Sequence, residues 1–111
     1  MRRDNPRVPV DFYINKLING VPYLARARDI SLGGIYLHKL IEPRVTGEAR
    51  ISLEFALPGQ KDVMWLDAEP VHFDGNDGVG FEFREVTPRI SRLLSDYIGS
   101  QNPAGDANPS I

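Results

Sequence analysis

Cysteine is absent from this chain of 111 residues, and no long apolar run is present. Without cysteine the chain can form neither a disulfide nor a thiolate metal site, and we expect a cytoplasmic protein in a reducing compartment. No apolar stretch approaches the roughly 20 residues that a membrane-spanning helix needs. The first basic residues lead straight into Asn5 and Pro6, without the apolar core of a signal peptide. We therefore expect one globular domain without a membrane segment or a targeting signal.

Residue patterns typical of enzymes are also lacking. The two histidines, His38 and His72, have no partner at the spacing of metal ligands, and Ser31 does not stand in the context of a nucleophile elbow. No glycine-rich loop joins a strand to a helix, as a phosphate-binding or dinucleotide-binding loop would. We therefore predict that the chain is not an enzyme and needs no cofactor or metal.

Charge is low in total but uneven along the chain. The formal net charge of −2 argues against a general affinity for nucleic acid. Residues 1–50 carry nine lysines and arginines against five acidic residues, whereas residues 51–111 carry four against ten. The first half is therefore the better place for an anionic ligand, although chance scatter in a short chain would give the same imbalance.

Alternation of apolar and polar residues with a period of two dominates the chain as far as residue 86. Asn19-Gly20 is typical of a tight hairpin turn, and Pro70 predicts a bulge or an edge position in a strand. Six short strands indicate a small antiparallel barrel, so the predicted fold class is all-β. The pattern places these strands at 8–18, 21–30, 34–40, 48–57, 62–73 and 79–86.

The pattern changes to helical spacing after Thr87. Thr87 suits an N-cap, Pro88 suits the first helical position, and Gly99 is predicted to end the helix. Residues 100–111 are small, polar and rich in proline, which predicts a disordered tail after a barrel domain of residues 8–99. The helix has one apolar stripe, which we expect to cover an open end of the barrel: Ile90, Leu93, Leu94, Tyr97 and Ile98.

Two short stretches are not required by the packing of a barrel. RRDNPR at residues 2–7 places Arg3 and Arg7 four positions apart, on a segment that Pro6 and Pro9 stiffen. DISLGG follows the second predicted strand, where an aspartate and a serine precede two glycines. Taken separately, the first is typical of a solvated segment and the second of an ordinary Asx or Ser turn between strands.

Taken together, the two stretches resemble the signature of the PilZ domain, a bacterial receptor for cyclic di-GMP. The signature is RxxxR before the first strand and (D/N)xSxxG after the second. It is matched here by Arg3, Arg7, Asp29, Ser31 and Gly34. GVGFEF and the short helix that follows also resemble this family, so the similarity extends over about residues 2–99. The resemblance implies a six-stranded antiparallel β-barrel, the PilZ-like split barrel, with a short C-terminal α-helix.

The chemistry of cyclic di-GMP accounts for these residue types. Arginine stays charged and can bind O6 and N7 of guanine, or phosphate oxygens, through two parallel hydrogen bonds. Asp29 would accept hydrogen bonds from N1–H and N2–H of guanine, and Ser31 would donate to an oxygen of the ligand. Gly33 and Gly34 would let the backbone approach the ligand without a Cβ between them. The resemblance also implies that Arg2 adds contacts to a second, stacked ligand.

Residues 1–9 are predicted to form a flexible arm that folds against the barrel when the ligand binds. We expect the signal to pass in trans to an unidentified effector protein, with no nucleic acid and no membrane as a partner. The main alternative is a PilZ-like adaptor that does not bind cyclic di-GMP. A barrel that binds single-stranded nucleic acid is disfavoured by the net charge and by the inward register of most aromatic residues. A flavin-binding split barrel is the remotest alternative.

Overall fold

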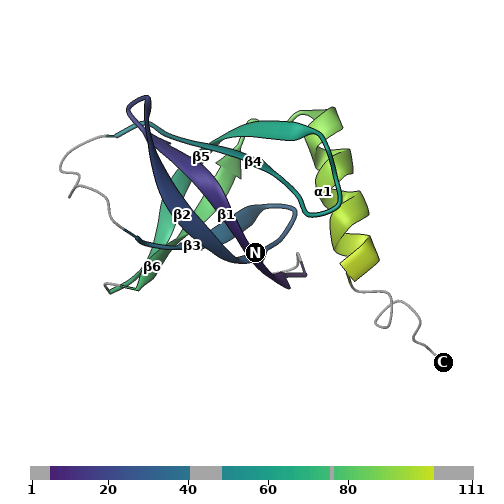
Figure 1. Ribbon diagram of the computed structural model, residues 1–111, viewed down its shortest axis with the longest axis horizontal. Helices are drawn as coiled ribbons and strands as arrows, with labels where there is room; N and C mark the ends of the chain where they lie inside the picture. Colours follow the sequence, from purple (N-terminus) through teal and green to yellow (C-terminus); the bar gives the residue numbers. More distant parts are fainter. Residues whose placement is uncertain (1–5, 41–48, 76, 102–111) are drawn as a thin grey trace.

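The computed structural model describes residues 6–40, 49–75 and 77–101. Six strands close into a barrel in the order β1-β2-β3-β6-β5-β4, and every neighbouring pair is antiparallel. One helix follows the strands (Figure 1). This architecture confirms the predicted fold class. The elements are β1 (Val8–Ile18), β2 (Val21–Ile30), β3 (Gly34–His38), β4 (Ile51–Ala56), β5 (Val63–Asp74), β6 (Gly78–Arg84) and α1 (Pro88–Gln101).

The turn and the bulge predicted from single residues are present. Asn19 and Gly20 join β1 to β2 with φ angles of 52° and 88°, as the predicted hairpin turn requires. Pairing between β5 and β6 shifts register between Pro70 and His72, which confirms the bulge expected at the proline.

Three strands are shorter than the alternation predicted. β3 ends at His38, and β4 runs from Ile51 to Ala56 because the chain turns after it, with the Gln60 amide bonded to the Leu57 carbonyl at 3.0 Å. β6 ends before Glu85, whose φ of 52° lies in the left-handed region that an extended strand does not use. Alternation of residue types continues past a strand when the backbone turns there, so it overstates strand length.

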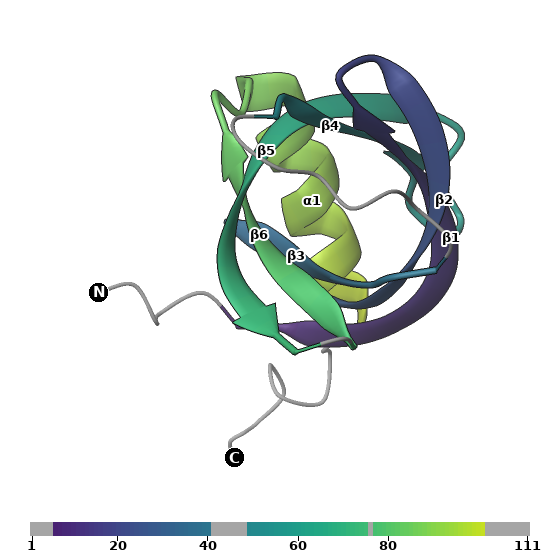
Figure 2. The ribbon, with the colours of Figure 1, turned by 90° about the vertical axis from the view of Figure 1, so that its left-hand side faces the viewer.

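Helix α1 lies across one end of the barrel, which Figure 2 shows as its far end. The Thr87 hydroxyl accepts a hydrogen bond from the Ile90 amide at 3.2 Å, so the predicted N-cap is confirmed. The prediction that Gly99 ends the helix is wrong. Gly99 does not have a positive φ and the helix continues to Gln101. The buried side of α1 belongs to the same core as the barrel interior: Ile90, Leu94, Tyr97 and Ile98.

Strands β3 and β6 approach each other closely at Gly34. A Cβ built on Gly34 would clash with the carbonyl oxygen of Phe81 at 2.3 Å. This oxygen belongs to the backbone, so it cannot move aside as the end of a flexible side chain could. Gly99 offers the opposite case, because a Cβ there would meet no heavy atom within 4 Å. Glycine is therefore a packing requirement at the first position and not at the second.

We expect the substitution Gly34→Ala to lower the free energy of unfolding by about 1–3 kcal/mol, because the added methyl group forces two paired strands apart. Its matched control is Gly99→Ala, which we expect to leave stability unchanged or to raise it by up to about 1 kcal/mol, since alanine favours the helix. Denaturant unfolding followed by circular dichroism measures both. Equal stabilities of the two variants would contradict this interpretation.

Candidate functional site

A β-bulge in β2 brings two neighbouring side chains to the outer surface of the barrel. Pairing of β2 with β3 passes from Ala27↔Leu37 to Asp29↔Tyr36, which leaves Arg28 as the extra residue. Consecutive side chains of a regular strand point to opposite faces, whereas a bulge lets two of them share one face. Arg28 and Asp29 do so here, because the Arg28 Nε donates to Asp29 Oδ2 at 2.9 Å.

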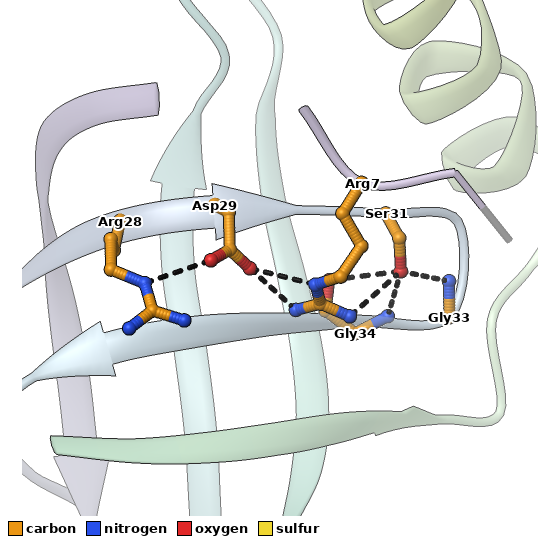
Figure 3. Close-up of polar contacts among 6 residues, drawn as sticks. All are labelled: Arg7, Arg28, Asp29, Ser31, Gly33 and Gly34. Carbon is orange, nitrogen blue, oxygen red and sulfur yellow. Dashed lines mark hydrogen bonds and ion pairs between the residues drawn. The ribbon is translucent and has the colours of Figure 1, made fainter. Parts of the chain in front are cut away.

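The Asp29 carboxylate lies between two arginines, as Figure 3 shows. On one side, Arg7 Nε donates to Oδ1 at 2.8 Å, and Arg7 Nη2 lies 2.8 Å from the same oxygen. On the other side is the Arg28 contact to Oδ2, and this hydrogen bond raises the pKa of Arg28. The structure thus brings Arg7 and Asp29 together across the hairpin, and it adds Arg28, a cation that the sequence analysis did not include.

Ser31 holds the turn between β2 and β3. Its backbone amide donates to the Gly34 carbonyl at 2.8 Å, and its hydroxyl accepts from the amides of Gly33 and Gly34 at 3.2 Å each. The side chain is 2% exposed, and Arg7 Nη1 reaches the hydroxyl only at 3.5 Å. These contacts form the ordinary Ser turn that was one interpretation of DISLGG. A hydrogen bond from Ser31 to a ligand stays a prediction.

The two glycines of the motif also have structural reasons to be there. The Gly33 carbonyl accepts from the Phe83 amide at 2.9 Å, which ties the turn to β6. Gly34 permits the close approach of β3 to the Phe81 carbonyl. Their predicted role beside a ligand is therefore additional to roles that the barrel itself requires.

The predicted arm, residues 1–9, is described only in part. Arg2 and Arg3 lie outside the described residues, so their predicted roles stay predictions. Val8 is buried in β1, Pro9 pairs with Asp29, and the Arg7 side chain is held by Asp29. The last residues of the predicted arm are therefore part of the barrel or bonded to it.

Tyr36 is a second residue that the sequence analysis missed. The Arg28 guanidinium lies over its ring, 3.6 Å from the centroid, and its hydroxyl donates to Asp74 Oδ2 at 2.9 Å. Strict alternation would put Arg28 and Asp29 on opposite faces, so the pattern gave no signal for this cluster. One feature of the sequence did point to this cluster, because Arg28 stands directly before Asp29, the aspartate of the second motif.

Metal clusters and membrane-spanning helices are both absent from residues 6–40, 49–75 and 77–101. No group of three or more acidic or histidine side chains that could hold a metal ion occurs there. No helix in this part of the chain is long and apolar enough to cross a membrane. Among the aromatic side chains, Tyr13, Trp65 and Phe73 are exposed, whereas Phe12, Phe55, Phe81, Phe83 and Tyr97 belong to the core or pack against it.

Comparisons with known proteins agree with this architecture. The family model of the PilZ domain matches residues 1–100. The PilZ domain of YcgR from Escherichia coli, solved with c-di-GMP, aligns with a TM-score of 0.70 and 22% identity over 95% of each chain. The PilZ domain of CeSA from a cellulose-synthesizing bacterium aligns with a TM-score of 0.63 and 13% identity over 86% of this chain and 96% of that one.

A larger protein also contains this fold. PlzA from Borreliella burgdorferi, solved in complex with c-di-GMP, aligns with a TM-score of 0.63 and 15% identity over 86% of this chain and 40% of PlzA. No curated protein matches the sequence. At these low sequence identities, the structural similarities show that the fold is shared.

We expect Ser31→Ala to lower the free energy of unfolding by about 1–3 kcal/mol, because two amides at a buried turn lose their acceptor. The control is Ser52→Ala, which removes a hydroxyl that donates to Asp67 Oδ1 at 3.0 Å on a less buried part of the sheet. We expect that variant to lose less. Thermal unfolding of both variants checks this, and a smaller loss for Ser31→Ala than for Ser52→Ala would contradict the structural role.

Proposed function

The chain belongs to the PilZ domain family, and from this membership we propose that it is a receptor for cyclic di-GMP that passes a signal to a partner protein. The observation that carries the proposal is the row of Arg7, Asp29 and Arg28 on the outer face of the barrel. Two structural neighbours, YcgR and PlzA, were solved with this ligand, which supports the same ligand class here.

The ligand offers the groups that this row of residues would bind. Cyclic di-GMP carries two phosphodiester anions and two guanines, and an arginine fork can bind either through parallel hydrogen bonds. The Arg7 side chain is 47% exposed, so part of its guanidinium is accessible to a ligand. The row has two guanidinium groups and one carboxylate, so it keeps one positive charge in a chain whose net charge is −2.

Asp29 must change partners if it is to bind guanine. A carboxylate has about four lone-pair positions. In the structure, arginine N–H groups approach three of them, two from Arg7 and one from Arg28. Guanine would bring two donors, N1–H and N2–H. We infer that guanine displaces Arg7 from Asp29 and that the freed Arg7 fork turns to the ligand, which couples binding to a movement at the start of the chain.

The signal would reach a partner through the altered surface. Several apolar side chains are exposed on the outer face of the barrel, and they would suit contact with a protein. Leu24 on β2 and Trp65 on β5 belong to one cross-strand row, since Asn15 pairs with Leu24 and Glu54, and Glu54 pairs with Trp65. This supports an effector in trans and does not identify it. It would serve equally an adaptor that does not bind cyclic di-GMP, which stays the alternative.

We expect Arg7→Ala to weaken binding of cyclic di-GMP at least about tenfold, because a hydrogen bond to a charged group contributes roughly 1.5–3 kcal/mol. Arg3→Ala should do the same. The control is Arg50→Ala, since Arg50 bonds to Asn19 near the end of β1 opposite to Arg7. Titration calorimetry measures the affinity and also the number of ligands, for which the presence of Arg2 predicts two.

The same titration tests the alternatives. A wild-type chain that does not bind cyclic di-GMP would favour the adaptor. Binding that survives both Arg7→Ala and Asp29→Ala unchanged would place the ligand elsewhere on the molecule.

The proposed movement makes a separate prediction for residues 1–7. We expect their backbone amides to become less mobile when cyclic di-GMP is added, because Arg3 and Arg7 then bind the ligand. Nitrogen-15 relaxation measures this. Val8 and Val10 in β1 provide the internal control, since both lie in the barrel and should be equally ordered in the two states. Equal mobility of residues 1–7 with and without the ligand would rule out the switch.

A further inference from the structure

We propose that the Arg28 guanidinium, which lies over the Tyr36 ring, is a stacking surface for a guanine base of the ligand. This inference rests on the proposed function and extends it to a residue outside the RxxxR and (D/N)xSxxG motifs. It assigns Arg28 direct contact with the base, beside the carboxylate that would accept hydrogen bonds from the edge of the same base.

The Tyr36 ring has a rigid support beneath it. A Cβ built on Gly78 would lie 2.8 Å from Tyr36 Cε1, and one on Gly80 would lie 3.9 Å from Tyr36 Cδ2. The ring therefore occupies space that a side chain at position 78 would need, whereas a Cβ at position 80 would make only an ordinary contact with it. Tyr36 points outward from the barrel, yet it is only 4% exposed. A side chain at position 78 would force the ring away from the sheet, so Gly78 helps to create the recess in which the ring lies.

Two further contacts hold the ring and the guanidinium in place. The Tyr36 hydroxyl donates to Asp74 Oδ2 at 2.9 Å, and burial raises the pKa of Tyr36, which keeps this donor protonated. Arg28 is held both by the ring, 3.6 Å from its guanidinium, and by Asp29 through a 2.9 Å hydrogen bond from Nε. These two restraints fix the orientation of the planar cation.

The outer side of the guanidinium is available to a base. One side of its plane lies on Tyr36, while the Arg28 side chain remains 49% exposed, so the accessible area lies on the side away from the ring. Nucleobases stack on arginine planes as they do on aromatic rings. Arg28, Asp29 and Arg7 follow one another along the surface in Figure 3. A base on Arg28 would have the Asp29 acceptor at its edge and the Arg7 donors beyond it.

Lysine distinguishes stacking from charge, because it keeps the positive charge of arginine without its plane. We expect both Arg28→Lys and Arg28→Gln to weaken cyclic di-GMP binding by the full chain at least about fivefold in titration calorimetry. The matched control is Arg50→Lys, which makes the same exchange at an arginine near the end of β1 opposite to Arg7, and we expect its affinity to stay within about twofold of wild type. Thermal unfolding verifies that each variant is folded.

A second measurement reports contact directly. In the wild-type complex we expect intermolecular nuclear Overhauser effects between the Arg28 side chain and guanine H8. If Arg28→Lys weakens binding but these effects are absent, Arg28 acts only by holding Asp29, and the stacking proposal is wrong. Wild-type affinity in Arg28→Lys would also overturn it.

The same measurements distinguish a failure of the stacking proposal from a failure of the proposed receptor function. If the wild-type chain binds cyclic di-GMP, Arg7→Ala weakens binding and Arg28→Lys does not, the receptor function stands and only the stacking surface fails. If the wild-type chain does not bind the ligand, both proposals fail.

Discussion

The bulge at Arg28 in β2 is the constraint on which the candidate site depends. Without it, the alternation of a regular strand would put Arg28 and Asp29 on opposite faces of the barrel. The bulge lets both side chains lie outside, where the Asp29 carboxylate meets a guanidinium from its own strand and one from the segment before β1. Ser31 then turns the chain immediately after this point, and Gly34 lets β3 return close against β6. Two register shifts thus position the cluster together with one tight turn: the bulge at Arg28 and the shift between Pro9 and Phe12, where β1 pairs with β2.

The contacts within the cluster are weaker than those that hold the barrel. Arg7 and Asp29 are 47% and 17% exposed, and ion pairs near the surface contribute only about 0–1 kcal/mol to stability. The core instead buries apolar side chains from all six strands and from α1. Arg7, Arg28 and Asp29 are therefore not part of the core that holds the barrel, unlike Ser31 and Gly34, which the barrel itself requires. Hydrogen bonds from a ligand to Asp29 would be of the same kind as those from Arg7, at roughly 1.5–3 kcal/mol each when a charged group takes part, so a ligand with two donors can replace Arg7 there.

Sequence patterns predicted the barrel and half of the cluster for identifiable physical reasons. Alternation reports which face of a strand is buried, and Asn19-Gly20 and Pro70 have backbone preferences that act locally, so these predictions were confirmed. The resemblance of the two motifs to the PilZ signature predicted that Arg7 and Asp29 belong to one site, and the structure brings the two side chains into contact. A bulge leaves no mark in a run such as ARARD, because the same letters suit a regular strand. The burial of the outward-facing Tyr36 could not be predicted from the sequence either, because it depends on Gly78 of β6, which is distant in the sequence. Helix α1 extends past Gly99 because glycine permits a positive φ but does not impose it.

Asp29 matters to this surface whether or not it touches a ligand. Two guanidinium groups held side by side repel each other, and the carboxylate between them both offsets that repulsion and orients each fork by a hydrogen bond. Removing it would release Arg7 and leave Arg28 with only the Tyr36 ring to hold it, so the loss of affinity in an Asp29 variant does not by itself demonstrate a contact between Asp29 and guanine. The single arginine variants are more informative, because each removes one cation while the carboxylate still holds the other. An anionic ligand would then meet one oriented guanidinium instead of two, and the difference between the two variants reports what each arginine contributes.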